Sequence, residues 1–299
     1  MFRFRRPLLS VVVVFYNMRR EAKRTLFTLT TQYQQGIDKD DYEVIVVDSG
    51  SSEPLDAGWV ISLQDNFQYH AIEATWPTPC EAMNVGIELA RSANVACIID
   101  GARMLSPNVL SGMLRGFAAH PNAYIYTFAL HLGKKLQYVA MLEDGYCQKV
   151  EDALLNSISW QSDGYQLFDI SCPAQSSRDG YLNPMAESNC FAVNKNVLQA
   201  MGCFDVRFRC RGGGMVNLDL HLRLMENKEL EAILLLGEGT FHQFHGGVAT
   251  NAKDLPTALM GFSEEYQQIR GKPYQKPERL PVYLGKIHRK TRRFLDLSN

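Results

Sequence analysis

Acidic and polar residues stand at the ends of apolar, largely β-branched runs, which are typical of strands buried on both faces of a parallel sheet. Asp48 ends one run and Asp100 another, while Tyr16 and Asn17 follow the run at residues 11–15. In open α/β sheets, ligands bind beyond the carboxyl ends of the strands. We therefore expect these four side chains to converge on one crevice of nucleotide size.

Two histidines, His242 and His245, follow the last predicted strand and precede Gly246 and Gly247. Their spacing in a loop lets both imidazoles approach one point, and the glycines allow close backbone approach. The pair fits either ligands of a cation or diphosphate, or hydrogen-bonded surface histidines.

The run Arg-Gly-Gly-Gly at residues 211–214 precedes a predicted helix. Three glycines before a helix N-terminus can cradle an anion such as phosphate. They can also form a flexible loop that closes over the crevice, which is the interpretation we favour. Asn217 is a residue type suited to cap the helix that follows.

The elements that must position these residues alternate between strand and helix in the first half of the chain, which predicts an α/β fold with a mostly parallel sheet. Here we expect strands at 11–15, 43–48, 69–75 and 95–100, and helices at 20–33, 80–93 and 107–118. The second half is less regular. We expect a hairpin of 124–132 with 136–142, a loop at 162–184, strands at 189–193 and 231–236, helices at 196–201, 218–225 and 256–270, and a Pro/Lys-rich tail.

The composition is typical of a globular protein, and the net charge provides no overall electrostatic attraction to nucleic acid. The 299 residues are 46% hydrophobic and 21% charged, with a net charge of −1. Seven cysteines without a CxxC pair indicate reduced thiols, and the apolar run at residues 8–16 is too short to span a bilayer. We therefore expect a cytoplasmic protein. Basic residues gather at Arg3, Arg5 and Arg6 and at 286–293, as solvated tails or as a contact with the inner face of a membrane.

The landmarks occur in the order seen in family 2 glycosyltransferases of the GT-A fold, and the chain resembles that family over residues 8–247. The resemblance is carried by Phe15-Tyr16-Asn17, Val46-Val47-Asp48-Ser49-Gly50-Ser51, Ile98-Ile99-Asp100-Gly101-Ala102, Met201-Gly202-Cys203-Phe204-Asp205 and Asn217-Leu218-Asp219-Leu220-His221-Leu222-Arg223. No single motif is specific, but the ordered set is.

The resemblance implies a GT-A-like sheet flanked by helices, with a donor half at residues 1–120, an acceptor-binding and catalytic half at 121–255, and a helix and basic tail at 256–299. It implies transfer of a sugar, with inversion, from a nucleotide-diphosphate donor, UDP-linked or GDP-linked with UDP favoured, to a glycan or lipid-linked acceptor. The residues expected to bind the donor are Phe15, Tyr16, Asn17, Asp48, Ser49, Asn84, Asp100, Gly101, Ala102 and Arg103. Asp48 resembles the aspartate that reads the base.

A metal and a base are implied in the same way. Asp100 resembles the first acid of the Asp-x-Asp motif, and His242 and His245 resemble the histidine that completes coordination of Mn²⁺ or Mg²⁺ in many GT-A enzymes. A divalent cation neutralises the charge that grows on a diphosphate leaving group, and a carboxylate serves as general base for the acceptor hydroxyl.

The sequence departs from the family pattern twice. Ala102 stands where the second acid of Asp-x-Asp is usual, so other groups hold the metal or Arg103 supplies positive charge to the diphosphate directly. Asn217 stands in the catalytic-base motif and has no basic lone pair at neutral pH, so Asp219 or Glu187 is expected to be the base.

Two rival functions remain at this point. The departures at Ala102 and Asn217 also fit a non-catalytic protein that keeps the nucleotide-sugar or glycan crevice without the chemistry. A nucleotidyltransferase-like enzyme would need a glycine- and basic-rich first loop, and residues 17–20 supply only the charge.

Overall fold

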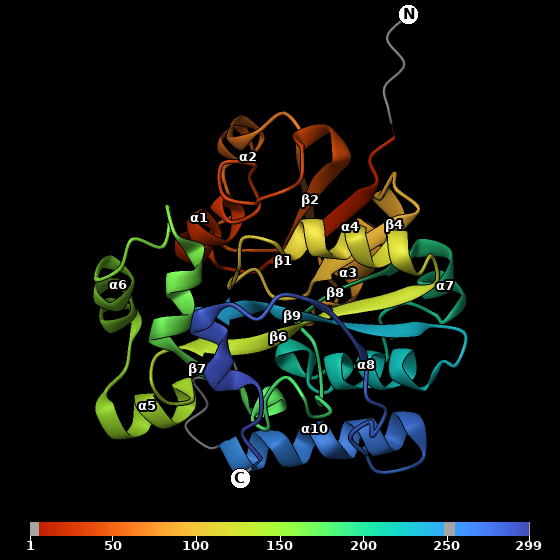
Figure 1. Ribbon diagram of the computed structural model, residues 1–299. Coiled ribbons are helices and arrows are strands. Elements are labelled where there is room, and N and C mark those ends of the chain that lie inside the picture. Colours follow the sequence, from red (N-terminus) through yellow and green to blue (C-terminus); the bar gives the residue numbers. More distant parts are fainter. Residues whose placement is uncertain (1–5, 248–254, 299) are drawn as a thin grey trace, which may run out of the picture.

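The computed structural model describes residues 6–247 and 255–298. Within them, a ten-stranded sheet runs in the order β10-β9-β6-β8-β4-β1-β2-β3, with β5 paired to β9 and β7 to β6, and helices flank both faces (Figure 1). The α/β class with a mostly parallel sheet is confirmed. The strands are β1 Leu9–Phe15, β2 Tyr42–Ser49, β3 Phe67–Ile72, β4 Asn94–Ile98, β5 Arg103–Leu105, β6 Ala123–Leu132, β7 Ser171–Pro173, β8 Cys190–Asn194, β9 Glu231–His242 and β10 Val282–Gly285.

The first half of the sheet is parallel, as the buried apolar runs predict. Strand β1 lies between β2 and β4 and is parallel to both, and β3 is parallel to β2. All seven residues of β1 are buried, which explains why the run lacks polar alternation. The carboxyl ends of β1, β2 and β4 therefore meet at one edge.

The second half mixes directions around the long strand β9. Strand β8 is antiparallel to both β4 and β6, whereas β6 and β9 are parallel. Two short strands that the sequence did not predict pair with β9 along different stretches: β10 with Ile233–Leu236 and β5 with Thr240–His242. Because β9 continues to His242, the histidine pair begins on the strand itself and not after it.

Alternate residues of β1 belong to two cores, one on each face of the sheet. Val11 and Val13 pack in the core that includes residues of α1 and α4, and Val12 and Val14 in the core that includes residues of α3 and α8. In Figure 1, α8 and α10 lie on the side of the sheet opposite α1 and α2. The α-helices with printed bounds are α1 Arg19–Phe27, α2 Ala57–Leu63, α3 Cys80–Leu89, α4 Val109–Ala119, α5 Gln137–Asp144, α6 Gln148–Asn156, α7 Lys195–Ala200, α8 Val216–Glu226 and α10 Leu255–Arg270.

The predicted hairpin after residue 132 is wrong. The segment expected as its second strand is helix α5, and α6 follows it. Gln137 and Ala140 are buried three residues apart, which is the spacing of one helix face, and Gly145 ends the helix in the left-handed conformation. The helix expected at 20–33 is also shorter, since α1 ends at Phe27.

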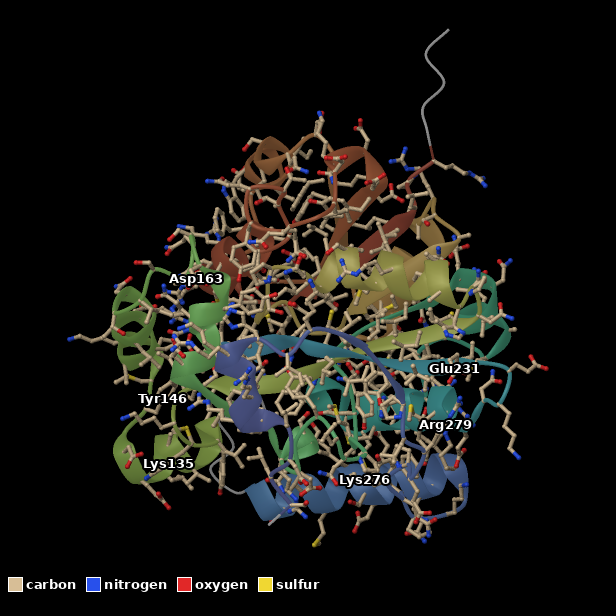
Figure 2. The ribbon with its side chains drawn as sticks, viewed as in Figure 1. Lys135, Tyr146, Asp163, Glu231, Lys276 and Arg279 are labelled. Carbon is tan, nitrogen blue, oxygen red and sulfur yellow. The ribbon has the colours of Figure 1, made fainter. Side chains whose placement is uncertain are left out.

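The C-terminal tail is folded onto the domain. Arg279 forms an ion pair with Glu231 at 3.5 Å (Figure 2). Lys276 forms an ion pair with Asp179 at 3.0 Å. Beyond β10, the 3₁₀ helix Arg289–Phe294 packs near a second one at Gly164–Ile170, inside the predicted loop. Of the N-terminal basic residues, Arg3 and Arg5 lie outside the described part of the chain. In that described part, no helix has the length and apolarity needed to cross a bilayer.

Candidate functional site

Asn17 joins the carboxyl end of β1 to the loop that follows β2, and Asp48 holds that loop in place. Asp48 is 1% exposed, and its two oxygens accept the backbone N–H of Ser51 and Leu55 at 3.1 and 3.0 Å. Asn17 has a positive φ of 53°, and its side-chain oxygen accepts the N–H of Ser52 at 2.9 Å. These contacts fix the loop at which we expected the nucleotide base. Contact of Asp48 with a base stays a prediction.

The other predicted donor contacts differ in their surroundings. Tyr16 is 44% exposed at the end of β1, whereas Phe15 is fully buried. A Cβ on Gly101 would lie 2.2 Å from Phe15 Cδ1, so the ring of Phe15 packs directly against the turn after Asp100. Ser49 is buried at the end of β2. The side-chain amide of Asn84, on α3, donates to Phe204 O at 2.9 Å and accepts the N–H of Phe204 at 3.1 Å.

Asp100, His242 and His245 lie together, as the sequence predicts for a metal site. Their ligand atoms are all within 4.8 Å of one another. Asp100 Oδ2 is 3.0 Å from His242 Nε2 and 3.6 Å from His245 Nε2, and the two Nε2 atoms are 3.1 Å apart. Asp100 lies two residues beyond β4, and the N–H of Ala102 donates to its Oδ1 at 3.0 Å. One oxygen is therefore held by the backbone while the other faces the imidazoles.

The charges of the three groups suit a cation. Burial alone would raise the pKa of Asp100, but the neighbouring His245 holds it well below its usual range. Burial, aided by Arg103, lowers the pKa of His242 to about 4, so this imidazole is neutral at pH 7. Burial would lower the pKa of His245, but the Asp100 carboxylate raises it above its ordinary value. A carboxylate, a neutral imidazole and an imidazole that a metal could deprotonate form a donor set that Mn²⁺ accepts.

A buried arginine lies behind this cluster. Arg103 is 6% exposed, pairs with His242 across β5 and β9, and has its Nε 3.8 Å from Asp100 Oδ2. Its Nε and Nη1 find no hydrogen-bond partner among the described residues. Burial lowers the pKa of Arg103, although Asp100 and Glu187 oppose the shift. Unpaired guanidinium N–H groups beside a metal-type cluster can bind an anion.

His131 on β6 and Gln137 on α5 extend the cluster, although neither residue was proposed from the sequence. His131 faces His242 across β6 and β9, with ring centroids 5.3 Å apart. Gln137 contacts His242 through both its amide atoms. The only sequence signal was that His131 lies on a predicted strand; the pairing of β6 with β9 brings both residues to the site.

The two candidate bases, Asp219 and Glu187, differ in what surrounds them. Asp219 is 1% exposed and bound by Arg223 Nε at 2.9 Å and by Arg270 Nε and Nη2 at 2.5 and 2.7 Å. Glu187, half-buried, has electrostatic contacts with Arg103 and Tyr274 and no hydrogen bond to a described residue.

The expectation that Asn217 caps α8 is wrong. The helix begins at Val216 with Met215 at the cap position, so Asn217 lies in the first turn. Its side chain turns instead to Asn189, donating to that amide oxygen at 2.7 Å. The N–H of Ile99 donates to Asn189 O at 3.3 Å, which places this amide pair beside the end of β4.

The glycine run lies against two other segments. All three glycines at residues 212–214 have positive φ, which explains the residue type. Gly212 donates to Pro77 O at 2.9 Å, and a Cβ on Gly214 would lie 3.2 Å from Glu265 of α10. Closure of this loop over a ligand stays a prediction.

The basic C-terminal segment is partly engaged with the protein. Arg293 donates to Phe168 O and Ser171 O, and Lys290 pairs with Asp169, while Ile287 is 43% exposed. Contact of this segment with a membrane stays a prediction.

The comparisons agree with the resemblance in sequence. Residues 10–198, more than half of the chain, match the family described as Glycosyl transferase family 2. S. aureus TarS has 11% sequence identity and a TM-score of 0.53 over 87% of this chain, which spans 43% of the TarS chain. TarS 1–349 in complex with UDP has 12% identity and a TM-score of 0.52, covering 88% of this chain and 72% of that one.

The same TarS fragment in complex with UDP-GlcNAc has 13% identity and a TM-score of 0.52, covering 87% of this chain and 66% of that one. These identities show likeness of fold alone. No curated protein matches this chain significantly in sequence. On the family match, the chain belongs to glycosyl transferase family 2.

Proposed function

We propose that this chain transfers a sugar from a nucleotide-diphosphate donor, UDP-linked in first place, to an acceptor hydroxyl with inversion. The observation that carries the proposal is the convergence of Asp100, His242 and His245 at the carboxyl edge of the sheet in a family 2 chain. UDP is favoured because the TarS structures of the same fold hold UDP and UDP-GlcNAc.

The proposed metal ligands are Asp100 Oδ2, His242 Nε2 and His245 Nε2. One carboxylate oxygen and two imidazole nitrogens within 4.8 Å of one another fit Mn²⁺ or a similar divalent ion. When bound, such an ion supplies positive charge against the leaving diphosphate.

Arg103 is the second source of positive charge in the proposal. It is buried, it keeps unpaired N–H groups, and it stands one residue after the alanine that replaces the usual acid. A guanidinium binds phosphate oxygens through two parallel hydrogen bonds without a metal. Arg103 thereby stabilises the diphosphate as it leaves.

Glu187 is the favoured base. In a single displacement the acceptor oxygen forms a bond to the anomeric carbon, the bond from that carbon to the diphosphate breaks, and the acceptor proton passes to a carboxylate. The Glu187 carboxylate makes no hydrogen bond to a described residue and lies in the field of Arg103, whereas Asp219 is held by two arginines. Asn217 is proposed to bind, and not to deprotonate, the acceptor.

The alternative is a binding protein that has lost the chemistry, favoured by Ala102 and Asn217. Calorimetry with UDP and UDP-GlcNAc, in Mn²⁺ and in EDTA, together with a UDP-release assay, separates the two. We expect Asp100→Asn to abolish the Mn²⁺-dependent part of the affinity and Arg103→Met to weaken binding even in EDTA. Donor binding without UDP release in the presence of any acceptor would favour the alternative, and absence of binding to both UDP and UDP-GlcNAc would refute a UDP-linked donor for either function.

A further inference from the structure

Gln137, the first residue of α5, is fully buried against one of the proposed metal ligands. Its Oε1 is 2.6 Å from His242 Nδ1, and its Nε2 donates to His242 O at 2.8 Å. One amide group therefore holds both the ring and the backbone of His242.

The orientation of this amide follows from its neighbours. Three acceptors surround the Nε2 atom of Gln137: His242 O at 2.8 Å, Glu151 Oε2 at 3.3 Å and Leu132 O at 3.4 Å. An amide oxygen at that place would face three acceptors, so the NH₂ group belongs there. The amide oxygen must then face His242 Nδ1, and Nδ1 must carry the proton.

Glu151, on α6, accepts a hydrogen bond from the Gln137 amide at 3.3 Å and so helps to hold it in place. Its side chain is fully buried, and its Oε2 also accepts the N–H of Phe244 at 2.5 Å and the hydroxyl of Tyr146 at 3.4 Å. Tyr146 lies on the turn between α5 and α6 (Figure 2). Because Phe244 stands between the two histidines, one carboxylate fixes both Gln137 and the backbone that carries the pair.

The proton on Nδ1 decides what His242 offers to Asp100. The facing Nε2 then carries a lone pair, 3.0 Å from Asp100 Oδ2. Without an acceptor at Nδ1, the opposite tautomer would be favoured, since Nε2–H would donate to Asp100 and the lone pair would lie on Nδ1, away from Asp100. Two facing lone pairs at 3.0 Å suit a cation between them or, in the metal-free protein, the Nε2–H of His245, whose Nε2 is 3.1 Å from that of His242.

We infer that Gln137, supported by Glu151, is a positioning residue that fixes His242 in the Nδ1–H tautomer and so presents its Nε2 lone pair toward Asp100. The inference rests on the proposed function for its purpose but concerns a property of the metal-free protein. The backbone N–H of Gln137 donates to His131 Nδ1 at 3.2 Å, so neutral His131 must carry its proton on Nε2. The two neighbouring histidines are therefore expected as opposite tautomers.

The test is ¹⁵N NMR of histidine-labelled, metal-free protein at pH 7, with the signals assigned through His242→Gln and His131→Gln. We expect the Nδ1–H form for His242 and the Nε2–H form for His131. Wild-type His242 in the Nε2–H form would overturn the inference, whatever any variant does. In Gln137→Met, His242 should shift to the Nε2–H form.

Metal affinity gives a second readout. Calorimetric Mn²⁺ affinity should fall by about 10- to 100-fold in Gln137→Met, as for other groups that orient a ligand. Gln34→Met is the matched control, because Gln34 is 3% exposed and makes three hydrogen bonds away from His242; its Mn²⁺ affinity and His242 tautomer should stay wild-type. Unchanged tautomer and Mn²⁺ affinity in Gln137→Met would overturn the inference. A wild-type protein that binds no Mn²⁺ but shows the expected tautomers would refute the metal proposal and leave the inference standing.

Discussion

Substitutions of Asp219 and Glu187, the two carboxylates considered as base, should have opposite effects on stability and activity. Asp219 is 1% exposed and forms ion pairs with Arg223 and Arg270, which are themselves 22% and 19% exposed. Breaking a fully buried pair costs about 3–5 kcal/mol. Asparagine keeps an acceptor and Asp205 also contacts Arg270 at 2.9 Å, so we expect Asp219→Asn to cost about 2–4 kcal/mol. At about 2 °C per kcal/mol for a chain of this size, its Tm should fall by about 4–8 °C.

Glu187→Gln should show the reverse. The carboxylate makes no hydrogen bond to a described residue, so its Tm should stay within about 1 °C of wild type, as for most substitutions away from such contacts. Loss of a general base lowers the rate by about 10²- to 10⁴-fold. The assay is UDP release from UDP-GlcNAc at saturating donor, measured at a temperature at which Asp219→Asn is still folded.

Arg270→Gln is the control for the ion pair. This substitution should lower Tm by an amount similar to that of Asp219→Asn. In the double variant, the decrease in Tm should be smaller than the sum of the decreases in the two single variants, because the two residues contact each other. Folded Asp219→Asn with wild-type Tm and no UDP release, beside active Glu187→Gln, would refute the assignment of these two carboxylates.

Two further predictions concern stability. Burial lowers the pKa of His221 to about 3, below the unfolded value of about 6.5, so the unfolded chain takes up this proton first and stability falls as the pH drops below about 6.5. Between pH 7 and pH 5, the free energy of unfolding measured in urea should fall by about 2 kcal/mol less in His221→Phe than in wild type. Equal decreases in the two proteins would contradict the prediction. Gly86→Ala should destabilise by about 1–3 kcal/mol, because its Cβ would lie 2.2 Å from Val12 Cγ1. Gly261→Ala in α10 meets open space and serves as control, and equal Tm changes for the two glycines would count against the packing argument.

The fold could be predicted where burial is uniform along a strand. The apolar runs of β1, β2 and β4 indicate only that both faces are covered. Together with the alternation of strands and helices, this predicted a parallel sheet, in which β1 lies between β2 and β4. Helix α5 could not be predicted, because its burial depends on contacts of Gln137 and Ala140 with distant segments. Strands β5 and β10 have three and four residues, too few for a periodic pattern to emerge.

The candidate site divides along the same line. Asp100, His242 and His245 could be proposed together because each stands near the end of a strand, and strand ends share an edge. The surroundings of Asp219 could not be foreseen, since Arg270 reaches it from 51 residues away. Gln137 was equally hidden, because its role depends on the pairing of β6 with β9, which is interrupted by a register shift between Tyr126 and Phe128.

The alanine at position 102 need not mean that the donor site is lost. Its N–H holds Asp100 and its carbonyl accepts the N–H of Gln243 at 2.8 Å, so this residue connects the two segments that carry the proposed ligands. A second acid beside Asp100 would add negative charge where a diphosphate must bind. With one acid, a buried Arg103 and a divalent ion, the proposed site is net positive by two charges, and a second acid would lower this to one. An alanine in place of the acid thus strengthens the attraction of the proposed site for the diphosphate, and it leaves the ion to Asp100 and the two histidines at the end of β9.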